Sequence, residues 1–478
     1  MQLTHILSFI CLLFYSAFSW AYAPLNALPE GNRASLLVEN LDSKTLLSTQ
    51  NNDQYFPPAS TLKVVTALAA KLELSPDFSF ETRLEQSGKN WVIRFSGDPT
   101  LSTNDLKKML SSARDKGLNK INGDIWLDNS TFTGYNRAIG WPWDILGVCY
   151  SAPSTAITLD GNCVHASIYT QKEGKTRVYV PEHFPIYAST QVKSVTKSEQ
   201  ESSQCGLELI SSPDNHYQLN GCLVERKKPL PLKFAVQDPE LYTQRMVHSV
   251  LRQLGIKLQG KIRIGSPSHG NTKLLASHHS EPLNVLLEDM LKRSDNLIAD
   301  NLAKTLGRTF FHQPGSFNNG TAAIKQIIFA HTGINLEALP LVDGSGLSRN
   351  NRFSSKAMAD ILHYIWRNDD KLNLIALLPV AGESGTLKYR QSMRKEPVVG
   401  TIIGKSGSLY GSYNMAGYGL DASGKPNSVF VQFVTDYFPP KRKAGEKPTV
   451  APITKFETLF YNDVVKFSQA ASQKHLGQ

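Results

Sequence analysis

The sequence predicts a mixed α/β (α+β) fold in which helices flank an antiparallel sheet and a large β-rich region is inserted into that unit. Three observations lead to this prediction. Hairpin patterns lie far apart in the chain, over residues 34–48 and 413–435. Helical patterns follow residue 60 and return after residue 281. Between them, residues 76–270 consist mainly of short apolar runs that Gly, Asn and Pro interrupt.

The elements of the main unit can be justified in order. An apolar run at residues 36–38 and a turn at 42–43 predict the first hairpin. Pro57 and Pro58 end this extended chain, and a helix that begins near Ser60 buries every third or fourth residue up to Leu72. Later apolar patterns predict helices over 281–293, 321–331 and 355–366, followed by a hairpin of 413–420 and 429–435.

The middle region is predicted to hold strands such as 91–95 and 125–127. A single helix interrupts it, with Asp238 as N-cap and Pro239 in the first turn. We read His278 and His279 as part of a polar loop. We therefore divide the chain into residues 22–75 and 276–478, which form the main domain, and an inserted region of two subdomains over 76–275.

Residues 1–21 have the pattern of a signal peptide. They contain no Asp, Glu, Lys or Arg, and their apolar core, residues 6–18, is too short to span a bilayer. Two cleavage patterns end at Ala21 and Ala23, and we favour Ala21 because Pro24 follows the other cut. A retained membrane anchor is the alternative. At the other end, residues 453–467 are amphipathic. Packing against the chain's own domain is the favoured reading, and a weak membrane-surface contact is the alternative.

Composition narrows the choice of partner. The 478 residues include 51 Lys and Arg against 41 Asp and Glu, a net charge of +10 that favours anionic partners. Nucleic acid, acidic lipid and an acidic cell-wall polymer all qualify by charge, but export makes nucleic acid a poor candidate. The chain length suggests two or three domains.

Four cysteines follow the predicted signal peptide, as expected of an exported protein with disulfides. Three connectivities are available to them. Because each neighbouring pair brackets a short segment, we favour Cys149 with Cys163 and Cys205 with Cys222. A zinc site is the alternative, but no C-x-x-C, H-E-x-x-H or suitably spaced His occurs, and we assign neither metal nor cofactor.

Three short motifs carry candidate chemistry. Ser60 and Lys63 stand one helical turn apart at a helix start, where a desolvated amine can activate a hydroxyl. Ser294 and Asn296 directly follow a predicted helix and offer a hydroxyl and an amide. Lys405 opens a Lys-Ser-Gly sequence after a strand-like run, residues 398–404, that is placed at a sheet edge. Each motif alone is weak, but their order and context make a strong joint signal.

Together these motifs match the S-x-x-K, S-D-N and K-T-G set of class A β-lactamases and penicillin-binding proteins. The sequence separation of 234 between Ser60 and Ser294 is too large for a single compact penicillin-recognising domain. The chain therefore resembles the class C low-molecular-mass penicillin-binding proteins of the penicillin-binding protein 4 type. Further stretches that resemble the family are residues 97–101, 140–143, 150–153, 343–349, 378–382 and 385–387, together with the two close cysteine pairs.

The resemblance implies a serine penicillin-recognising, β-lactamase-like transpeptidase fold and a periplasmic D-alanyl-D-alanine carboxypeptidase/endopeptidase. Such an enzyme removes the terminal D-Ala of peptidoglycan stem peptides, hydrolyses D-Ala cross-links and is acylated by β-lactams. Two alternatives remain from the same motifs. A serine β-lactamase would need a base for fast deacylation, and no E-x-x-L-N-type signal lies in the expected place. A catalytically inactive cell-wall scaffold would not need the intact motif residues.

The resemblance also implies a role for each motif residue. Ser60 would attack the carbonyl group between two D-alanines and form an acyl-enzyme. Lys63, neutral at rest, would take the serine proton, with its pKa lowered by burial and by nearby Lys405. Ser294, together with Lys63, would relay that proton to the leaving amine.

The remaining positions would bind the substrate. Asn296 would hydrogen-bond the substrate amide. Lys405 and Ser406 would hold the terminal carboxylate. The backbone N–H groups of Ser60 and Ser408 would form the oxyanion hole.

Three departures from the family pattern are visible. Ser406 replaces the usual Thr but keeps its hydroxyl. Gram-negative relatives carry an Asp and a Gln that contact the free end of diaminopimelate, and these positions are here Ile145 and Tyr410. Asp144 directly precedes Ile145, and the arginine that matches the pattern of these relatives is kept as Arg349. We expect the preference for free diaminopimelate to be weakened or rebuilt.

Overall fold

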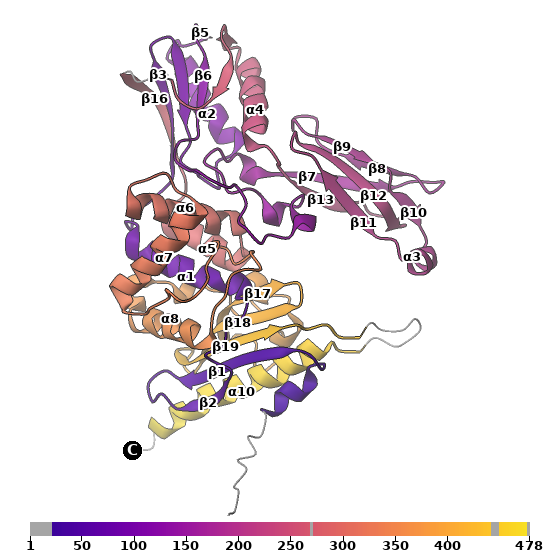
Figure 1. Ribbon diagram of the computed structural model, residues 1–478, viewed down its shortest axis with the longest axis vertical. Helices are drawn as coiled ribbons and strands as arrows, with labels where there is room; N and C mark the ends of the chain where they lie inside the picture. Colours follow the sequence, from indigo (N-terminus) through magenta and orange to yellow (C-terminus); the bar gives the residue numbers. More distant parts are fainter. Residues whose placement is uncertain (1–21, 268–270, 441–448, 476–478) are drawn as a thin grey trace, which may run out of the picture.

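The main sheet brings the two ends of the chain together. The computed structural model describes residues 22–267, 271–440 and 449–475, so the predicted signal peptide, residues 1–21, lies outside the described residues. Five antiparallel strands lie in the order β17-β18-β19-β1-β2 (Figure 1). Their bounds are Arg33–Asn40 (β1), Leu46–Gln50 (β2), Ile402–Leu409 (β17), Ser412–Leu420 (β18) and Pro426–Thr435 (β19).

Alternate residues of the sheet serve two different cores. In β19, Val429, Val431 and Phe433 face the helix layer, whereas Phe430 and Val434 pack toward the C-terminal helix. The helix layer contains α1 (Leu62–Glu73), α5 (Leu283–Arg293), α6 (Asn296–Phe311), α7 (Phe317–Thr332), α8 (Ser355–Arg367) and the short α9 (Asp369–Leu372). Helix α1 is apolar nearly all round and is buried from Leu62 to Ala70, as expected of a helix inside a core.

The opposite face of the sheet is covered by α10 (Pro452–His475). Its side chains Phe456, Phe460 and Val464 are buried against the sheet, so the amphipathic C-terminal stretch packs on its own domain, as favoured. None of the helices within the described ranges is long and apolar enough to span a membrane.

The first part of the inserted region is a mixed sheet with two helices. Strands lie in the order β15-β6-β4-β3-β16, and a two-stranded sheet pairs β5 with β14. The bounds are Glu81–Ser87 (β3), Asn90–Arg94 (β4), Lys120–Ile121 (β5), Ile125–Asp128 (β6), Lys257–Leu258 (β14), Ile262–Ile264 (β15), Thr272–His279 (β16), Thr103–Asp115 (α2) and Pro239–Leu254 (α4).

The second part of the insertion projects sideways in Figure 1 and contains two further sheets. Its elements are Cys163–Thr170 (β7), Thr176–Tyr179 (β8), Tyr187–Thr190 (β9), Lys193–Val195 (β10), Lys197–Ser203 (α3), Leu207–Ser211 (β11), His216–Val224 (β12) and Leu230–Ala235 (β13). Disulfides join Cys149 to Cys163 and Cys205 to Cys222, which are the pairs favoured from the spacing.

The structure corrects the secondary-structure prediction in the middle region. Among its described residues, three α-helices (α2, α3 and α4) occur instead of one. The overlooked α2 begins with a capping box in which Ser102 and Asp105 satisfy each other's backbone N–H groups. In addition, His278 and His279 lie in strand β16 and not in a loop. The sequence pattern does not reveal this strand, because the strand carries polar residues on the face that is open to solvent.

Candidate active site

Ser60 lies in a short 3₁₀ turn, Ala59–Thr61, that leads into α1. The preceding Ala59 has a positive φ of 49°, a conformation that non-glycine residues rarely adopt. Lys63 follows one turn later and is fully buried. Its Nζ donates to the Ser60 hydroxyl at 3.0 Å, and also to Ser345 O at 2.7 Å. The helix start thus brings a hydroxyl and a desolvated amine into direct contact.

The second motif lies at the junction of α5 and α6. Ser294 ends α5 with a positive φ of 59°, and Asp295 caps α6 by accepting from Ile298 N at 3.0 Å. Asn296 is the first residue of α6. Its Oδ1 accepts from Lys63 Nζ at 2.6 Å, and its Nδ2 donates to the Tyr150 carbonyl at 2.7 Å. The asparagine therefore connects α1 with a loop of the inserted region.

The third motif lies inside edge strand β17 and not after its end, because the strand continues through Leu409. Lys405 is fully buried, and its Nζ donates to Ser294 Oγ at 3.0 Å and to Ser406 O at 2.8 Å. A Cβ atom added to Gly407 would lie 2.9 Å from Ser60 N. Glycine is thus required for the strand to approach the nucleophile.

Burial and charge shift the pKa values of both lysines. Burial lowers the pKa of Lys63 to about 8, although the negative charges of Asp300, Asp343 and Asp295 act in the opposite direction. Burial also lowers the pKa of Lys405, and the charges of Lys63 and Arg390 lower it further. The electrostatic effect between the two lysines is therefore seen on Lys405. The family resemblance, in contrast, predicts it on Lys63.

A pocket of about 520 Å³ opens above these groups. Ser60, Ser294, Asn296 and Ser408 contribute its polar wall. Its other lining residues are mostly apolar and are Pro142, Asp144, Ile145, Tyr150, Gly346, Leu347, Arg349, Leu409 and Tyr410. Among the predicted catalytic and substrate-binding residues, Lys63, Lys405 and Ser406 do not line it. Lys63 contacts Ser60, and Lys405 contacts Ser294 and the Ser406 carbonyl.

Several residues of the site lie in the family-like stretches of the sequence, but the motifs assign them no individual role. Asp343 accepts from Trp141 Nε1 at 2.9 Å and so ties the inserted region to the loop beside Lys63. Thr386 places its hydroxyl 2.7 Å from that of Ser406. Asp300 was not singled out at all. Its only sequence signal is a carboxyl group on the apolar side of a helix, four residues after Asn296.

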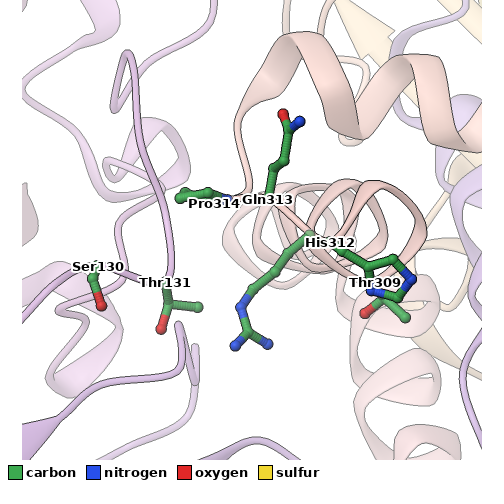
Figure 2. Close-up of a pocket in the computed structure, with 7 residues that line it drawn as sticks. Ser130, Thr131, Thr309, His312, Gln313 and Pro314 are labelled. Carbon is green, nitrogen blue, oxygen red and sulfur yellow. The ribbon is translucent and has the colours of Figure 1, made fainter.

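A second cavity of about 520 Å³ lies at the far end of α6 (Figure 2). Figure 2 shows Ser130 and Thr131 on one wall, opposite Thr309 and His312. It contains none of the motif residues, so we place the candidate active site at Ser60. Among the residues that the structure describes, no group of three or more His, Cys, Asp or Glu side chains is arranged to hold a metal ion.

Comparison with known proteins agrees with this geometry. Residues 23–455 match the D-Ala-D-Ala carboxypeptidase 3 (S13) family. The chain belongs to this family. It is 38% identical to the D-alanyl-D-alanine carboxypeptidase DacB of Haemophilus influenzae over 451 residues, with 92% of each chain covered. It is also 26% identical to a D-alanyl-D-alanine carboxypeptidase of Actinomadura sp., covering 80% of this chain and 74% of the relative.

Solved structures in the S13 family share the fold. The crystal structure of penicillin binding protein 4 (dacB) from H. influenzae superposes with a TM-score of 0.85 at 37% identity, covering 93% of this chain and 98% of that chain. The same protein complexed with a novel β-lactam gives a TM-score of 0.80 at 36% identity, covering 94% and 99%. The predicted class of penicillin-binding protein and its fold are therefore confirmed.

Proposed function

We propose that this S13 family member is a serine D-alanyl-D-alanine carboxypeptidase and endopeptidase that acts on peptidoglycan stem peptides and their cross-links. The observation that carries the proposal is the 3.0 Å contact between Lys63 Nζ and Ser60 Oγ beside an open pocket. A lysine whose pKa is lowered to about 8 holds a neutral fraction near neutral pH, which is what a general base requires.

In the acylation step, the Ser60 hydroxyl loses its proton to neutral Lys63 while Oγ attacks the carbonyl carbon of the scissile D-Ala–D-Ala bond. The backbone N–H groups of Ser60 and Ser408 stabilise the oxyanion. The C–N bond then breaks, and the proton reaches the leaving amine through Ser294. This hydroxyl contacts Lys405, so the relay runs beside both lysines. Water later attacks the ester and releases the shortened peptide.

Recognition of the substrate ends is divided between two parts of the pocket. Ser406, held by Thr386, is assigned to the terminal carboxylate, with the Lys405 amine bound to the Ser406 carbonyl. Asn296 is assigned to the substrate amide.

The stem-peptide side chain is assigned to the apolar part of the pocket. There Arg349 lies with its guanidinium 5.5 Å from the ring centroid of Tyr410. Asp144 lines the same pocket, beside the position where Ile145 replaces the acid of the relatives. This supports a rebuilt diaminopimelate site.

The domain organisation and the location of the protein are part of the same proposal. Residues 22–75 and 276–478 make the catalytic domain, with an insertion over 76–275 that supplies one wall of the pocket. The pattern of residues 1–21 and two disulfides support export to the periplasm.

The proposal is tested by intact-mass spectrometry after mixing the protein with benzylpenicillin and removing free drug. We expect one penicilloyl group on Ser60 that persists for many minutes, and release of D-Ala from a pentapeptide. A Ser60→Ala variant should show neither. An adduct that vanishes while the drug is consumed would indicate a β-lactamase. A folded protein that forms no adduct and releases no D-Ala would indicate a scaffold.

A further inference from the structure

Asp300 is a buried carboxyl group that does not touch the proposed reacting atoms. It lies on α6, one helical turn after Asn296, and its exposed fraction is 0%. Because residues four apart share a helix face, both side chains point toward α1. Asn296 contacts Lys63 directly, whereas Asp300 contacts the backbone of a separate loop.

That loop is the Gly344–Ser345 segment. Oδ1 of Asp300 accepts from the N–H groups of both Gly344 and Ser345, each at 2.9 Å. The carbonyl groups of the same two residues accept from α1: Thr66 Oγ1 donates to Gly344 O at 2.7 Å, and Lys63 Nζ donates to Ser345 O at 2.7 Å. The segment is therefore held between α6 and α1, with its N–H groups bound by one helix and its carbonyl groups by the other.

The segment packs closely against α6. A Cβ atom added to Gly344 would lie 2.7 Å from Ala299 O and 2.6 Å from Ala303 Cβ. Both contacts are too close for a real side chain. The two hydrogen bonds to Asp300 Oδ1 hold the Gly344–Ser345 backbone in this place, and the Ser345 carbonyl is one of three acceptors around the Lys63 amine.

The neighbouring Asp343 differs from Asp300 because both of its oxygens are hydrogen-bonded. Its two oxygens accept from the backbone N–H of Gly346 and Ser348, from Trp141 Nε1 and from Asn351 Nδ2, at 2.7–2.9 Å. In contrast, Oδ2 of Asp300 is buried with no hydrogen-bond partner among the described residues. An anionic oxygen left in this state would be strongly unfavourable.

The surrounding charges agree with a neutral Asp300. Burial and the charge of Asp343 raise its pKa well above the ordinary range, against the opposing charge of Lys63. Lys304, one turn further along α6, is the next buried amine, and burial lowers its pKa to about 8. Asp295 completes the charged groups around Lys63.

We propose that Asp300 is a positioning residue which, as a neutral carboxyl group, anchors Gly344 and Ser345 and thereby fixes the Lys63 amine beside Ser60. This inference rests on the proposed function and names a further residue that the reaction needs. It assigns Asp300 no contact with substrate. Its effect reaches Ser60 through the Ser345 carbonyl and Lys63.

The test measures the second-order rate of acylation by benzylpenicillin as a function of pH, with thermal unfolding as a check of folding. Asp300→Asn keeps the Oδ1 acceptor and the neutral state, so we expect a rate within about threefold of the parent and an unchanged pH midpoint. Asp300→Ala removes the anchor and admits water to Lys63. We expect the rate to fall by about tenfold or more, and the midpoint to move to higher pH as the amine is hydrated.

Asp289→Asn is the matched control, because Asp289 forms an exposed pair with Arg293 on α5 and should leave both readings unchanged. A fall in the midpoint of Asp300→Asn would overturn the neutral state, since it would mean that a negative charge had been removed near Lys63. A parent-like rate and midpoint in Asp300→Ala would overturn the positioning role.

If Asp300→Ala does not fold, Asp300→Glu takes its place, because it keeps the carboxyl group but displaces it by one methylene. A slower rate with a shifted midpoint supports the proposal, and parent-like behaviour overturns it. A folded parent protein that does not react with benzylpenicillin or release D-Ala would overturn the proposed function and this inference together. A reactive parent with an unaffected variant overturns the inference alone.

Discussion

The hydroxyl of Thr386 lies 2.7 Å from the hydroxyl of Ser406. Ser406 belongs to β17, the strand that borders the pocket. Serine lacks the methyl group that restricts a threonine side chain, so this contact supplies the restraint on the hydroxyl. Thr386 belongs to a short 3₁₀ turn, Gly385–Leu387, that packs beside β17. The orientation of the Ser406 hydroxyl, which we propose to bind the substrate carboxylate, is thus set by a second hydroxyl outside the motif.

The first prediction concerns this pair. Thr386→Val keeps the shape of the side chain but removes the hydrogen bond, at a cost of about 1 kcal/mol. We expect KM for a peptide with a free terminal carboxylate to rise about fivefold, with little change in kcat. Steady-state D-Ala release measures both. Thr386→Ser should behave like the parent, and an unchanged KM in Thr386→Val would contradict the assignment.

The second prediction concerns pH. Because burial lowers the pKa of Lys63 to about 8, the neutral amine falls about tenfold for each pH unit below that value. The acylation rate with benzylpenicillin should therefore rise with pH and level off above about 8. Lys63→Arg should be inactive at every pH, since a guanidinium keeps its proton. A flat profile from pH about 6 to 9 would argue against Lys63 as the base.

The third prediction concerns Gly346. Its φ is +82°, and a Cβ atom there would meet Ala59 O at 1.9 Å, directly before the nucleophile. Gly346→Ala should destabilise the fold by about 1–3 kcal/mol and displace Ser60. Thermal unfolding and penicillin acylation measure the two effects. Gly206→Ala is the control, because nothing lies within 4 Å of a Cβ atom at that position. Equal behaviour of the two variants would refute the prediction.

The fourth prediction compares the two disulfides. They close loops of similar length, with sequence separations of 14 and 17, so each should stabilise the fold by a similar amount, about 3 kcal/mol. Cys149 immediately precedes Tyr150, whose carbonyl accepts from Asn296. The double variant Cys149→Ser/Cys163→Ser should therefore lose acylation rate, whereas Cys205→Ser/Cys222→Ser should lose stability only. Equal acylation rates in folded samples of both would be evidence against the link.

The fifth prediction concerns Asp144 in the pocket wall. If this acid and Arg349 together hold the zwitterionic end of diaminopimelate, Asp144→Asn should reduce turnover of a diaminopimelate pentapeptide by about tenfold. A peptide with a blocked side chain offers no charged amine and should be affected little. Parallel kcat/KM measurements on both peptides give the answer. A parent protein with no preference between them would instead support a weakened site.

Much of the fold could be predicted because its signals are local. Pro57 and Pro58 before an apolar helix, the Asp238 cap and the period-two strands all follow from short stretches of sequence. Helix α2 was missed because its apolar face, Leu106, Met109 and Leu110, is separated by polar residues, and its capping box uses Asp in place of the usual Glu or Gln.

The candidate site was predicted residue by residue from three motifs and a family resemblance. The structure joins Ser60, Lys63 and Asn296 in one set of hydrogen bonds and Ser294 to Lys405 in a second. Their catalytic roles stay predictions until the variants are measured. The structure also shows that Ser294 contacts Lys405, a pairing that motif order does not contain.

The sequence by itself determined the order of the motifs, the helix that carries Ser60 and Lys63, and the spacing that favours the two disulfides. Only the tertiary structure decided that Asp300 reaches the Gly344–Ser345 backbone, that Asp343 binds Trp141, and that Thr386 meets Ser406. The reason is physical. Helix and strand periodicity act between residues close in the chain, whereas burial, pKa shifts and backbone anchoring depend on groups that only the packing of distant segments brings together.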